Sequence, residues 1–400
     1  DTPANNHEAE WEEVTINNSG AFLNGGSNVI AILAANSSFG SSDFSIDAEL
    51  KTPDGSSSSG TPTPGAPNSV STDLVPPQIR QVAHSPNQPT AGQDVVVSAR
   101  ITDPDGVASA TLSYQIVNPG SFIRKSDTAY ENPANWISLA MRDDGLGGDV
   151  VAGDSTYSAV VPASVQAHRR LVRYRITTED GGGTAVTVPY PDDEQPNFAY
   201  FVYDGLPSWT GASNPGSTPT ATFTPDLLDD FATYHLIANG TDVTNSQYNS
   251  SSDGVHMAGA LVYEGNVYDH IEFENRGEAS TYQSGKNKWR FHFNRARDFE
   301  ARDNWGKKYE SPWDEMNFDA CASPWAPVHR GMAGVEEVVS YRLYELAGIP
   351  SPRTHYVHFR VVDAASEAGG SQYDSDLWGL YTAIEHPDGS FLDDRGPVSY

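Results

Sequence analysis

Basic and aromatic side chains alternate in one short run of the sequence, KNKWRFHF at residues 286–293. A β-strand turns successive side chains to opposite faces, so this run would separate cations from aromatic rings. One face would carry Lys286, Lys288, Arg290 and His292, and the other Trp289, Phe291 and Phe293. Ammonium and guanidinium groups held rigidly on one face could bind phosphate groups. The alternative is a solvated edge strand whose lysines prevent edge-to-edge association.

The cations of this chain are concentrated around that run. The whole chain has 24 Lys and Arg against 53 Asp and Glu, a net charge of −29. Residues 276–308 nevertheless contain nine Lys or Arg and only four Asp or Glu. An acidic protein repels an anionic ligand, so a local positive pocket would be needed to bind one. The overall acidity argues against nucleic-acid binding, which requires a basic face.

The composition indicates a multidomain globular protein outside the cytoplasm. A length of 400 residues suggests two to four domains, and 38% hydrophobic residues suffice for packed cores. No apolar run is long enough to span a membrane, and the single Cys321 excludes an internal disulfide framework. The acidic, Asn/Ser/Gly-rich composition is typical of bacterial surface or secreted proteins. No signal peptide occurs in this segment, which we expect to be a piece of a longer chain.

Two Pro/Gly/Ser-rich stretches divide the chain into three parts, mostly β. The predicted parts are a C-terminal piece of a β-domain (1–52), a linker (53–77), a β-sandwich (78–205), a second linker (206–226) and an α+β domain (227–400). The phrase FLNGGSNVIAILAANSSFGSSDFSIDAEL in the first part resembles the closing segment of galactose-binding-like jelly-roll modules.

The second part shows the alternation of a β-sandwich. DVVVSARITD, ATLSYQIV, YSAVVPAS and LVRYRITTED predict strands separated by Asp-Gly turns, which resembles bacterial immunoglobulin-like or fibronectin-type modules. Four acidic residues gather in one loop, Asp143, Asp144, Asp149 and Asp154. They would either bind calcium or form a solvated hairpin turn, since they lack the ligand spacing of an EF-hand.

The third part contains one strongly periodic helix, GVEEVVSYRLYELAGI at residues 334–349. Its apolar residues recur at helical spacing, and Gly348 followed by Pro350 marks its end. We expect Val338, Val339 and Leu343 to pack against the sheet that holds Phe291 and Phe293. THYVHFRVVD and DLWGLYTAIEH then predict two buried strands.

Three segments in this part, in this order, resemble the CotH kinase family of spore-coat-protein-H-like atypical kinases. They are FENRGEASTYQSGKNKWRFHF, SPWAPVHRGMAGVEEVVSYRLYELAGIPSPRTHYVHFRV and DLWGLYTAIEHPDGSFLDDRG. The family combines an RGNSS-like turn, a basic strand, an amphipathic helix, a PRT strand and a WGLY…E strand. The resemblance implies β-sandwich modules followed by a kinase-like N-lobe, which is a partial CotH domain.

The resemblance also implies roles for individual residues. In a kinase-like N-lobe, a strand lysine holds the nucleotide phosphates and pairs with a helix glutamate. Lys288 with Glu337 is the favoured pair. The strand period of two places Lys286 on the same face as Lys288, so the alternation alone does not choose between the two lysines. Arg290 would join them on the strand, with Arg276 and Ser280 in the turn over the phosphates and Glu385 at the hinge beside the adenine. In that turn Glu278 and Ala279 replace the usual Asn and Ser.

These roles predict ATP and Mg²⁺ as ligands and protein Ser or Thr as phosphate acceptor. The catalytic and metal-binding Asp residues of the family follow the WGLY…E strand, so we expect them beyond residue 400 and expect no metal ligands within this segment. The segment alone is expected to transfer little phosphate. PWDEM at residues 312–316 is more consistent with a structural Trp turn than with a metal motif, and Asp303 is not expected to be a base.

Two other functions compete with the kinase hypothesis. One is a non-catalytic surface or adhesion protein with a degenerate kinase-like domain and β-modules that bind carbohydrate or protein. The other is a carbohydrate-binding array attached to an enzyme, although no paired carboxylates for glycoside hydrolysis are identifiable.

Overall fold

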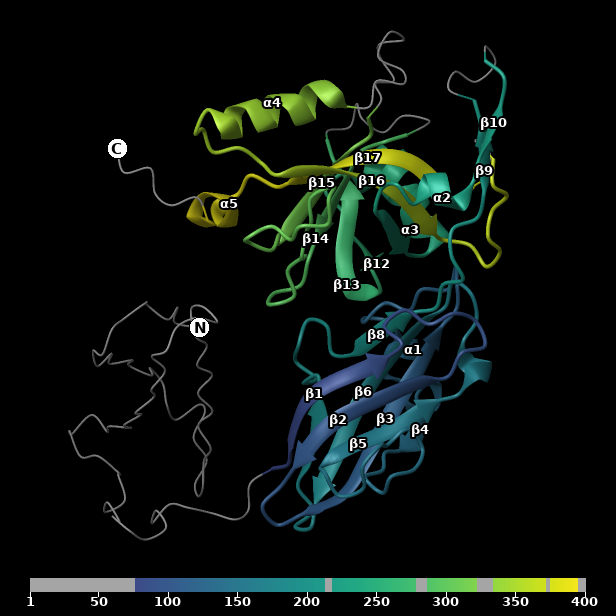
Figure 1. The fold of residues 1–400 in the computed structure, drawn as a ribbon, viewed down its shortest axis with the longest axis vertical. Coiled ribbons are helices and arrows are strands. Elements are labelled where there is room, and N and C mark those ends of the chain that lie inside the picture. The colour runs from purple at the N-terminus through teal and green to yellow at the C-terminus, as the bar shows by residue number, and fades with distance from the viewer. Residues whose placement is uncertain (1–75, 213–217, 278–285, 322–333, 372–374, 395–400) are drawn as a thin grey trace, which may run out of the picture. The chain divides into compact units, whose positions relative to one another are not determined.

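The computed structural model describes residues 76–212, 218–277, 286–321, 334–371 and 375–394 (Figure 1). All of them belong to one compact unit, Asp73–Tyr400. The expected jelly-roll piece and most of the first linker lie outside the described residues. The described chain is mostly β, as the sequence predicts, and consists of a β-sandwich followed by a closed β-barrel.

The sandwich has one sheet in the order β1–β2–β5 and a second in the order β4–β3–β6–β7, with β8 also paired to β6. Its strands are β1 Gln78–Ser85, β2 Val95–Thr102, β3 Val107–Val117, β4 Ile137–Ala140, β5 Thr156–Val161, β6 Leu171–Asp180, β7 Ala185–Val188 and β8 Phe198–Phe201.

Strict alternation of apolar residues explains the sandwich core. Along β2, Val95, Val97, Ala99 and Ile101 are all at most 1% exposed, whereas the residues between them face outward. Leu112 of β3 belongs to the same cluster from the facing sheet. The four strands predicted from alternation in this part correspond to β2, β3, β5 and β6, so these predictions are confirmed.

Seven strands close the barrel in the order β11–β12–β13–β14–β15–β17–β16. They are β11 Thr233–Ile237, β12 Met257–Tyr263, β13 Asn266–Asn275, β14 Trp289–His292, β15 Glu315–Asp319, β16 Thr354–Val362 and β17 Leu377–Glu385. Six of the seven pairings are antiparallel, and the parallel pairing of β11 with β16 closes the ring. The predicted strands around Phe291, Val357 and Tyr381 are confirmed as β14, β16 and β17.

Aromatic rings fill the barrel. Trp289, Phe291, Phe318, Phe359 and Tyr381 are fully buried and contact one another at ring-centroid distances of 5.0–6.1 Å. Aromatic pairs at such distances stabilise a core beyond the area they bury. The alternation in β14 therefore has the predicted consequence for Lys288, Arg290 and His292, which lie outside while the rings lie inside. Lys286, predicted on the same face, instead lies against the Tyr381 ring. β14 lies between β13 and β15, so the edge-strand alternative is wrong.

The helices are short, except for one. They are α1 Thr128–Glu131, α2 Pro225–Leu228, α3 Gly240–Tyr248, α4 Val335–Leu346 and α5 Gly389–Asp394, with 3₁₀ turns at Pro133–Asn135, Ala163–Val165 and Ser250–Ser252. Between the sandwich and the barrel, within the expected second linker, β9 Trp209–Gly211 and β10 Ala221–Phe223 form a hairpin. Thr210 of β9 also bridges to Ser371.

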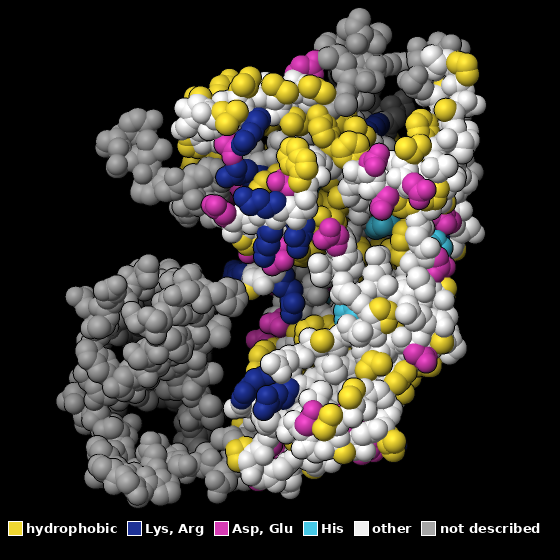
Figure 2. Space-filling model, in the orientation of Figure 1, with side chains coloured by type: hydrophobic (Ala, Val, Ile, Leu, Met, Phe, Trp, Pro, Cys, Tyr) yellow, Lys and Arg dark blue, Asp and Glu magenta, His cyan; other side chains and the backbone are white. Residues whose placement is uncertain are grey.

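The predicted packing of α4 is wrong. The helix ends as expected, with Gly348 at φ +77° just beyond it. However, Val339 is 47% and Leu343 is 60% exposed, and α4 has no buried residue. Hydrophobic side chains are visible along α4 in Figure 2. Helical spacing identified the apolar face correctly, but no described part of the chain buries it.

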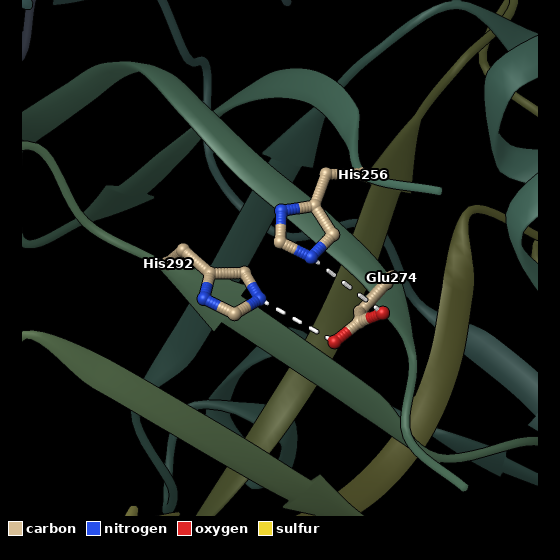
Figure 3. A group of neighbouring side chains, drawn as sticks. All are labelled: His256, Glu274 and His292. Atoms are coloured by element: carbon tan, nitrogen blue, oxygen red, sulfur yellow. Dashed lines mark ion pairs between the residues drawn. The ribbon is translucent and has the colours of Figure 1, made fainter. Parts of the chain in front are cut away.

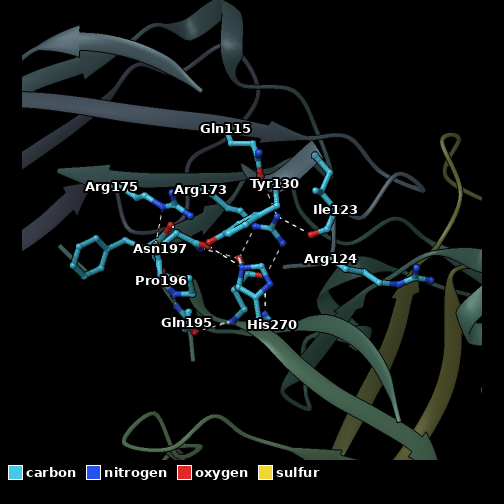
Figure 4. Close-up of polar contacts among 12 residues, drawn as sticks. Gln115, Ile123, Arg124, Tyr130, Arg173, Arg175, Gln195, Pro196, Asn197 and His270 are labelled. Carbon is cyan, nitrogen blue, oxygen red and sulfur yellow. Dashed lines mark hydrogen bonds and ion pairs between the residues drawn. The ribbon is translucent and has the colours of Figure 1, made fainter. Parts of the chain in front are cut away.

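The sandwich and the barrel share an apolar cluster and a buried ion pair. The cluster combines residues of β3, β6 and β8 with residues of β11, β12 and β16. Beside it, Arg173 of β6 donates from Nε and Nη2 to the two oxygens of Asp269 of β13, at 2.6 and 3.0 Å. Both side chains are fully buried. Figure 4 shows Arg173 among Gln115, Tyr130 and His270.

Candidate functional site

The outer face of β14 is paired, residue by residue, with the outer face of β15. The strand register sets each basic side chain of β14 opposite a polar one. The pairs are Lys288 with Asp319 at 2.5 Å, Arg290 with Asn317 at 3.3 Å and His292 with Glu315 at 3.1 Å. On the face drawn in Figure 2, Lys and Arg side chains gather below α4, with Asp and Glu between them. The cationic face is therefore compensated locally rather than left as a bare positive surface.

Lys288 and Glu337 lie in the same neighbourhood but are not directly paired. The ammonium of Lys288 contacts Asp319, and its side chain is 42% exposed. Burial raises the pKa of Glu337, as does the nearby Asp319 carboxylate, whereas Lys288 and Arg276 act in the opposite direction. The first turn of α4 thus lies close enough to the basic strand for their charges to interact. The predicted direct pair of Lys288 with Glu337 is therefore not formed, because Asp319 holds the Lys288 ammonium instead.

Lys286 occupies a different environment from Lys288. Its ammonium donates to the carbonyl of Leu380 and lies 4.1 Å from the centre of the Tyr381 ring. Burial lowers the pKa of Lys286 to about 8, although Cys321 and Asp319 act to raise it. Lys286 is therefore engaged with β17, and Lys288 is the lysine that faces the outer surface beside α4.

A hollow of about 430 Å³ adjoins this face. Its walls are Asp253, Gly254, Glu274, Asn275, Arg276, Gly277 and Arg290. Two residues predicted to bind phosphate, Arg276 and Arg290, therefore come together in one concavity. Within the described residues, Arg276 Nη1 is buried and has no hydrogen-bond partner. A buried guanidinium nitrogen without a hydrogen-bond partner costs free energy, and a bound anion could accept the missing hydrogen bond.

One of the predicted site residues, Glu385, is not brought to this face. Glu385 is paired across the sheet with Met316, three residues along from the Asp319–Thr382 pair, which is roughly 10 Å along the strand. Its carboxylate is buried and accepts a hydrogen bond from the backbone N–H of Arg353 at 2.9 Å. Ser280 lies outside the described residues.

Two histidines and a glutamate form a cluster that the sequence reasoning missed. His256, Glu274 and His292 have ligand atoms that all lie within 4.8 Å of one another (Figure 3). They come from the residue before β12, from β13 and from β14, and all project from the outer face of the barrel. The alternation of Glu272 and Glu274 along β13 indicated that both carboxylates share one face of the strand. The sequence did not show that the strand register brings His256 and His292 to the same place.

The acidic loop of the sandwich uses its carboxylates to hold itself together. Asp143 accepts hydrogen bonds from the N–H groups of Gly153, Asp154 and Ser155 at 2.8–3.1 Å. Asp149 accepts from Gly145 at 2.6 Å. Asp143, Asp149 and Asp154 do lie close together, but these contacts are those of a self-stabilised hairpin turn.

The two sequence motifs set aside earlier are structural in the fold. Trp313 of PWDEM is 2% exposed and stacks on Tyr309 at 5.6 Å. Asp303 accepts hydrogen bonds from the N–H groups of Trp305 and Lys307, both at 2.9 Å, which closes a local turn.

Comparison with known proteins adds no family to this picture. No family model matches the chain, and no curated protein matches it. Among the described helices, none is long and apolar enough to cross a membrane. The arrangement of side chains on the outer face of the barrel is therefore the basis for any functional conclusion.

Proposed function

We propose that residues 227–400 form the nucleotide-binding part of a CotH-like protein kinase domain. The phosphates of ATP would occupy the hollow beside β13 and β14, and the sandwich would serve as an accessory module. The proposal rests on the resemblance of the motifs and on one geometric observation. That observation is the convergence of Arg276, Arg290 and the backbone of Gly277 on a single hollow of about 430 Å³.

The chemistry of the hollow suits a polyphosphate. Guanidinium groups bind phosphate oxygens through two parallel hydrogen bonds, and a glycine permits close approach of the backbone. The volume lies within the usual range for small-molecule sites. Mg²⁺ would accompany ATP, with its protein ligands among the residues that the resemblance expects after Glu385.

Lys288 and Glu337 would take the roles of the strand lysine and the helix glutamate. In the structure Asp319 holds the Lys288 ammonium, and the charge of Lys288 reaches Glu337. A bound phosphate would compete with Asp319 for the ammonium. Transfer to Ser or Thr of a protein substrate, at the cell surface or outside the cell, would require the catalytic Asp residues that the resemblance expects after Glu385.

Isothermal titration of the 400-residue chain with Mg-ATP tests this proposal. Loss of one charged hydrogen-bonding group costs about 1.5–3 kcal/mol, so Arg290→Ala and Lys288→Ala should each weaken binding roughly ten-fold or more. Lys308→Ala is the matched control because Lys308 pairs with Glu300 at 2.5 Å in the loop beyond β14. Equal loss from all three variants would indicate diffuse charge attraction, and absence of binding to the wild type would contradict the proposal.

A non-catalytic surface or adhesion protein is the second candidate. It is favoured by the partners that Lys286, Lys288 and Arg290 already have and by the exposed apolar residues of α4. Exposed apolar patches commonly mark protein interaction sites. A wild-type chain that binds no Mg-ATP would support this alternative.

A further inference from the structure

The register of three barrel strands gathers two imidazoles around one carboxylate. β12 and β13 pair Met257 with Phe273, so the preceding His256 falls opposite Glu274. β13 and β14 pair Glu272 with His292, which places His292 diagonally across from Glu274. Residues on the same face of neighbouring strands lie close enough for their side chains to meet. Two of the three residues therefore lie on regular strands, and His256 immediately precedes a third strand.

Both histidines direct the same nitrogen toward Glu274. His292 Nε2 lies 3.4 Å from Glu274 Oε1, and His256 Nε2 lies 3.8 Å from Glu274 Oε2. Figure 3 shows the two rings on the same side of the carboxylate. Zinc binds nitrogen at about 2.0–2.1 Å, so the donor atoms of a tetrahedral site are roughly 3.3 Å apart. The two nitrogen–oxygen distances are close to that value, and all three ligand atoms lie within 4.8 Å of one another.

The opposite nitrogen of each ring is held by another carboxylate. His256 Nδ1 lies 2.7 Å from Glu272, and His292 Nδ1 lies 3.1 Å from Glu315. Glu315 in turn lies 3.4 Å from His386 Nε2. Metal-binding histidines almost always donate their second N–H to such an acceptor, which fixes the tautomer and leaves Nε2 free to bind the metal. Here both histidines have that outer partner.

The two imidazole rings also lie against each other beside Glu274. They are stacked at a centroid distance of 4.4 Å and an angle of 17°. His292 Nε2 is also buried and has no hydrogen-bond partner in the part of the chain that the structure describes. A metal ion would satisfy both lone pairs and the carboxylate together.

We propose that His256, Glu274 and His292 bind one divalent transition-metal ion, with zinc the expected occupant. Two imidazole nitrogens and a carboxylate suit zinc and its neighbours in the first row, whereas Mg²⁺ and Ca²⁺ prefer oxygen ligands throughout. Three protein ligands leave the fourth position open. Glu274 also lines the hollow that holds Arg276 and Arg290.

The test uses the untagged 400-residue chain, stripped of metal and titrated with ZnCl₂ in excess Mg²⁺ and without nucleotide. The wild type should bind about one zinc ion per chain and unfold at a higher temperature with zinc than without. Glu274→Gln and His256→Gln should each weaken zinc binding by about 100-fold or more. Glu272→Gln, which removes only the outer partner of His256, should weaken it by about 10–100-fold. Co²⁺ should give the visible absorption of a four-coordinate site in the wild type but not in Glu274→Gln or His256→Gln.

His168→Gln is the matched control, because His168 also faces a carboxylate, that of Glu367 at 3.1 Å, but lies outside the cluster. It should bind zinc like the wild type. The melting temperature of each metal-free variant shows whether it is folded. Absence of zinc binding by the wild type, or binding that is unchanged in both Glu274→Gln and His256→Gln, would overturn the proposal. Because no nucleotide is used, neither result depends on the kinase-like function.

Discussion

The buried pair of Arg173 and Asp269 should be among the most sensitive points of the fold. Arg173 makes two hydrogen bonds to Asp269 and donates from Nη1 to Gln115 and to the carbonyl of Ile123, at 3.1 and 2.8 Å. Asn197 donates to the same carboxylate at 2.9 Å. The pair joins the sandwich to the barrel, and neither side chain reaches solvent.

Replacing Arg173 by Met should destabilise the protein by about 3–5 kcal/mol. The cost arises because the Asp269 carboxylate would stay buried without its counter-charge. Replacing both residues by apolar ones removes both charges, so the double variant Arg173→Met/Asp269→Leu should be less destabilised than the sum of its single variants. This result does not require the ion pair itself to stabilise the fold, because each single variant mainly measures the cost of leaving one charge buried and unpaired.

Guanidinium denaturation followed by fluorescence and circular dichroism measures these free energies of unfolding. Arg142→Met is the control, because Arg142 pairs with Asp144 at 3.4 Å and both side chains are about half exposed. Such surface pairs contribute only about 0–1 kcal/mol. If Arg173→Met cost no more than Arg142→Met, the buried pair would have no special role in joining the two parts.

Two further predictions concern pH and packing. Burial lowers the pKa of His270 to about 4 despite the adjacent Asp269. As the pH falls, the imidazole is therefore protonated in the unfolded chain before it is protonated in the folded one. About 3 kcal/mol of stability should be lost between pH 6.5 and pH 4 for this reason. Other buried histidines change stability in the same direction. The contribution of His270 is therefore measured as the difference between the wild type and His270→Asn in urea unfolding at several pH values. Stability curves of the two proteins that run parallel with pH would contradict the prediction. Leu343→Ser on the exposed face of α4 should change stability by less than about 0.5 kcal/mol, whereas Phe359→Ala in the barrel core should cost about 3–5 kcal/mol. Similar losses for both, measured by guanidinium denaturation, would mean that α4 is buried in solution.

Local patterns in the sequence predicted the strands but not how they come together. Alternation located β2 and β14 because one face of each is buried and a strand has a period of two. The apolar run of β17 identified it as a buried strand instead. Closure of the barrel depends on β11 pairing with β16, and no local pattern records a partner more than a hundred residues away. The same limit explains the error for α4, since helical spacing identifies an apolar face but not what covers it.

For the candidate site as well, the sequence predicted the direction of individual side chains but not their partners on other strands. The outward direction of Lys288 and Arg290 followed from the alternation, as did the inward direction of the rings. Asp319, the partner of Lys288, was missed because it lies on another strand and is set opposite by the register. The cluster around Glu274 was missed for the same reason, since its three residues are far apart in the sequence.

Closure of the barrel by its only parallel pairing also constrains how the chain acquires its fold during synthesis. Thr233 is matched with His358 and Ile237 with Val362, so β11 waits for about 120 further residues before its second neighbour exists. Until then β11 and the outermost completed strand are open edges that can pair with other chains. Contacts between such distant segments slow folding because the loop must close before the contacts form. The ring is completed only after β16 and then β17, which joins β15 to β16, have been made. Until then the aromatic interior of the barrel is exposed to aggregation.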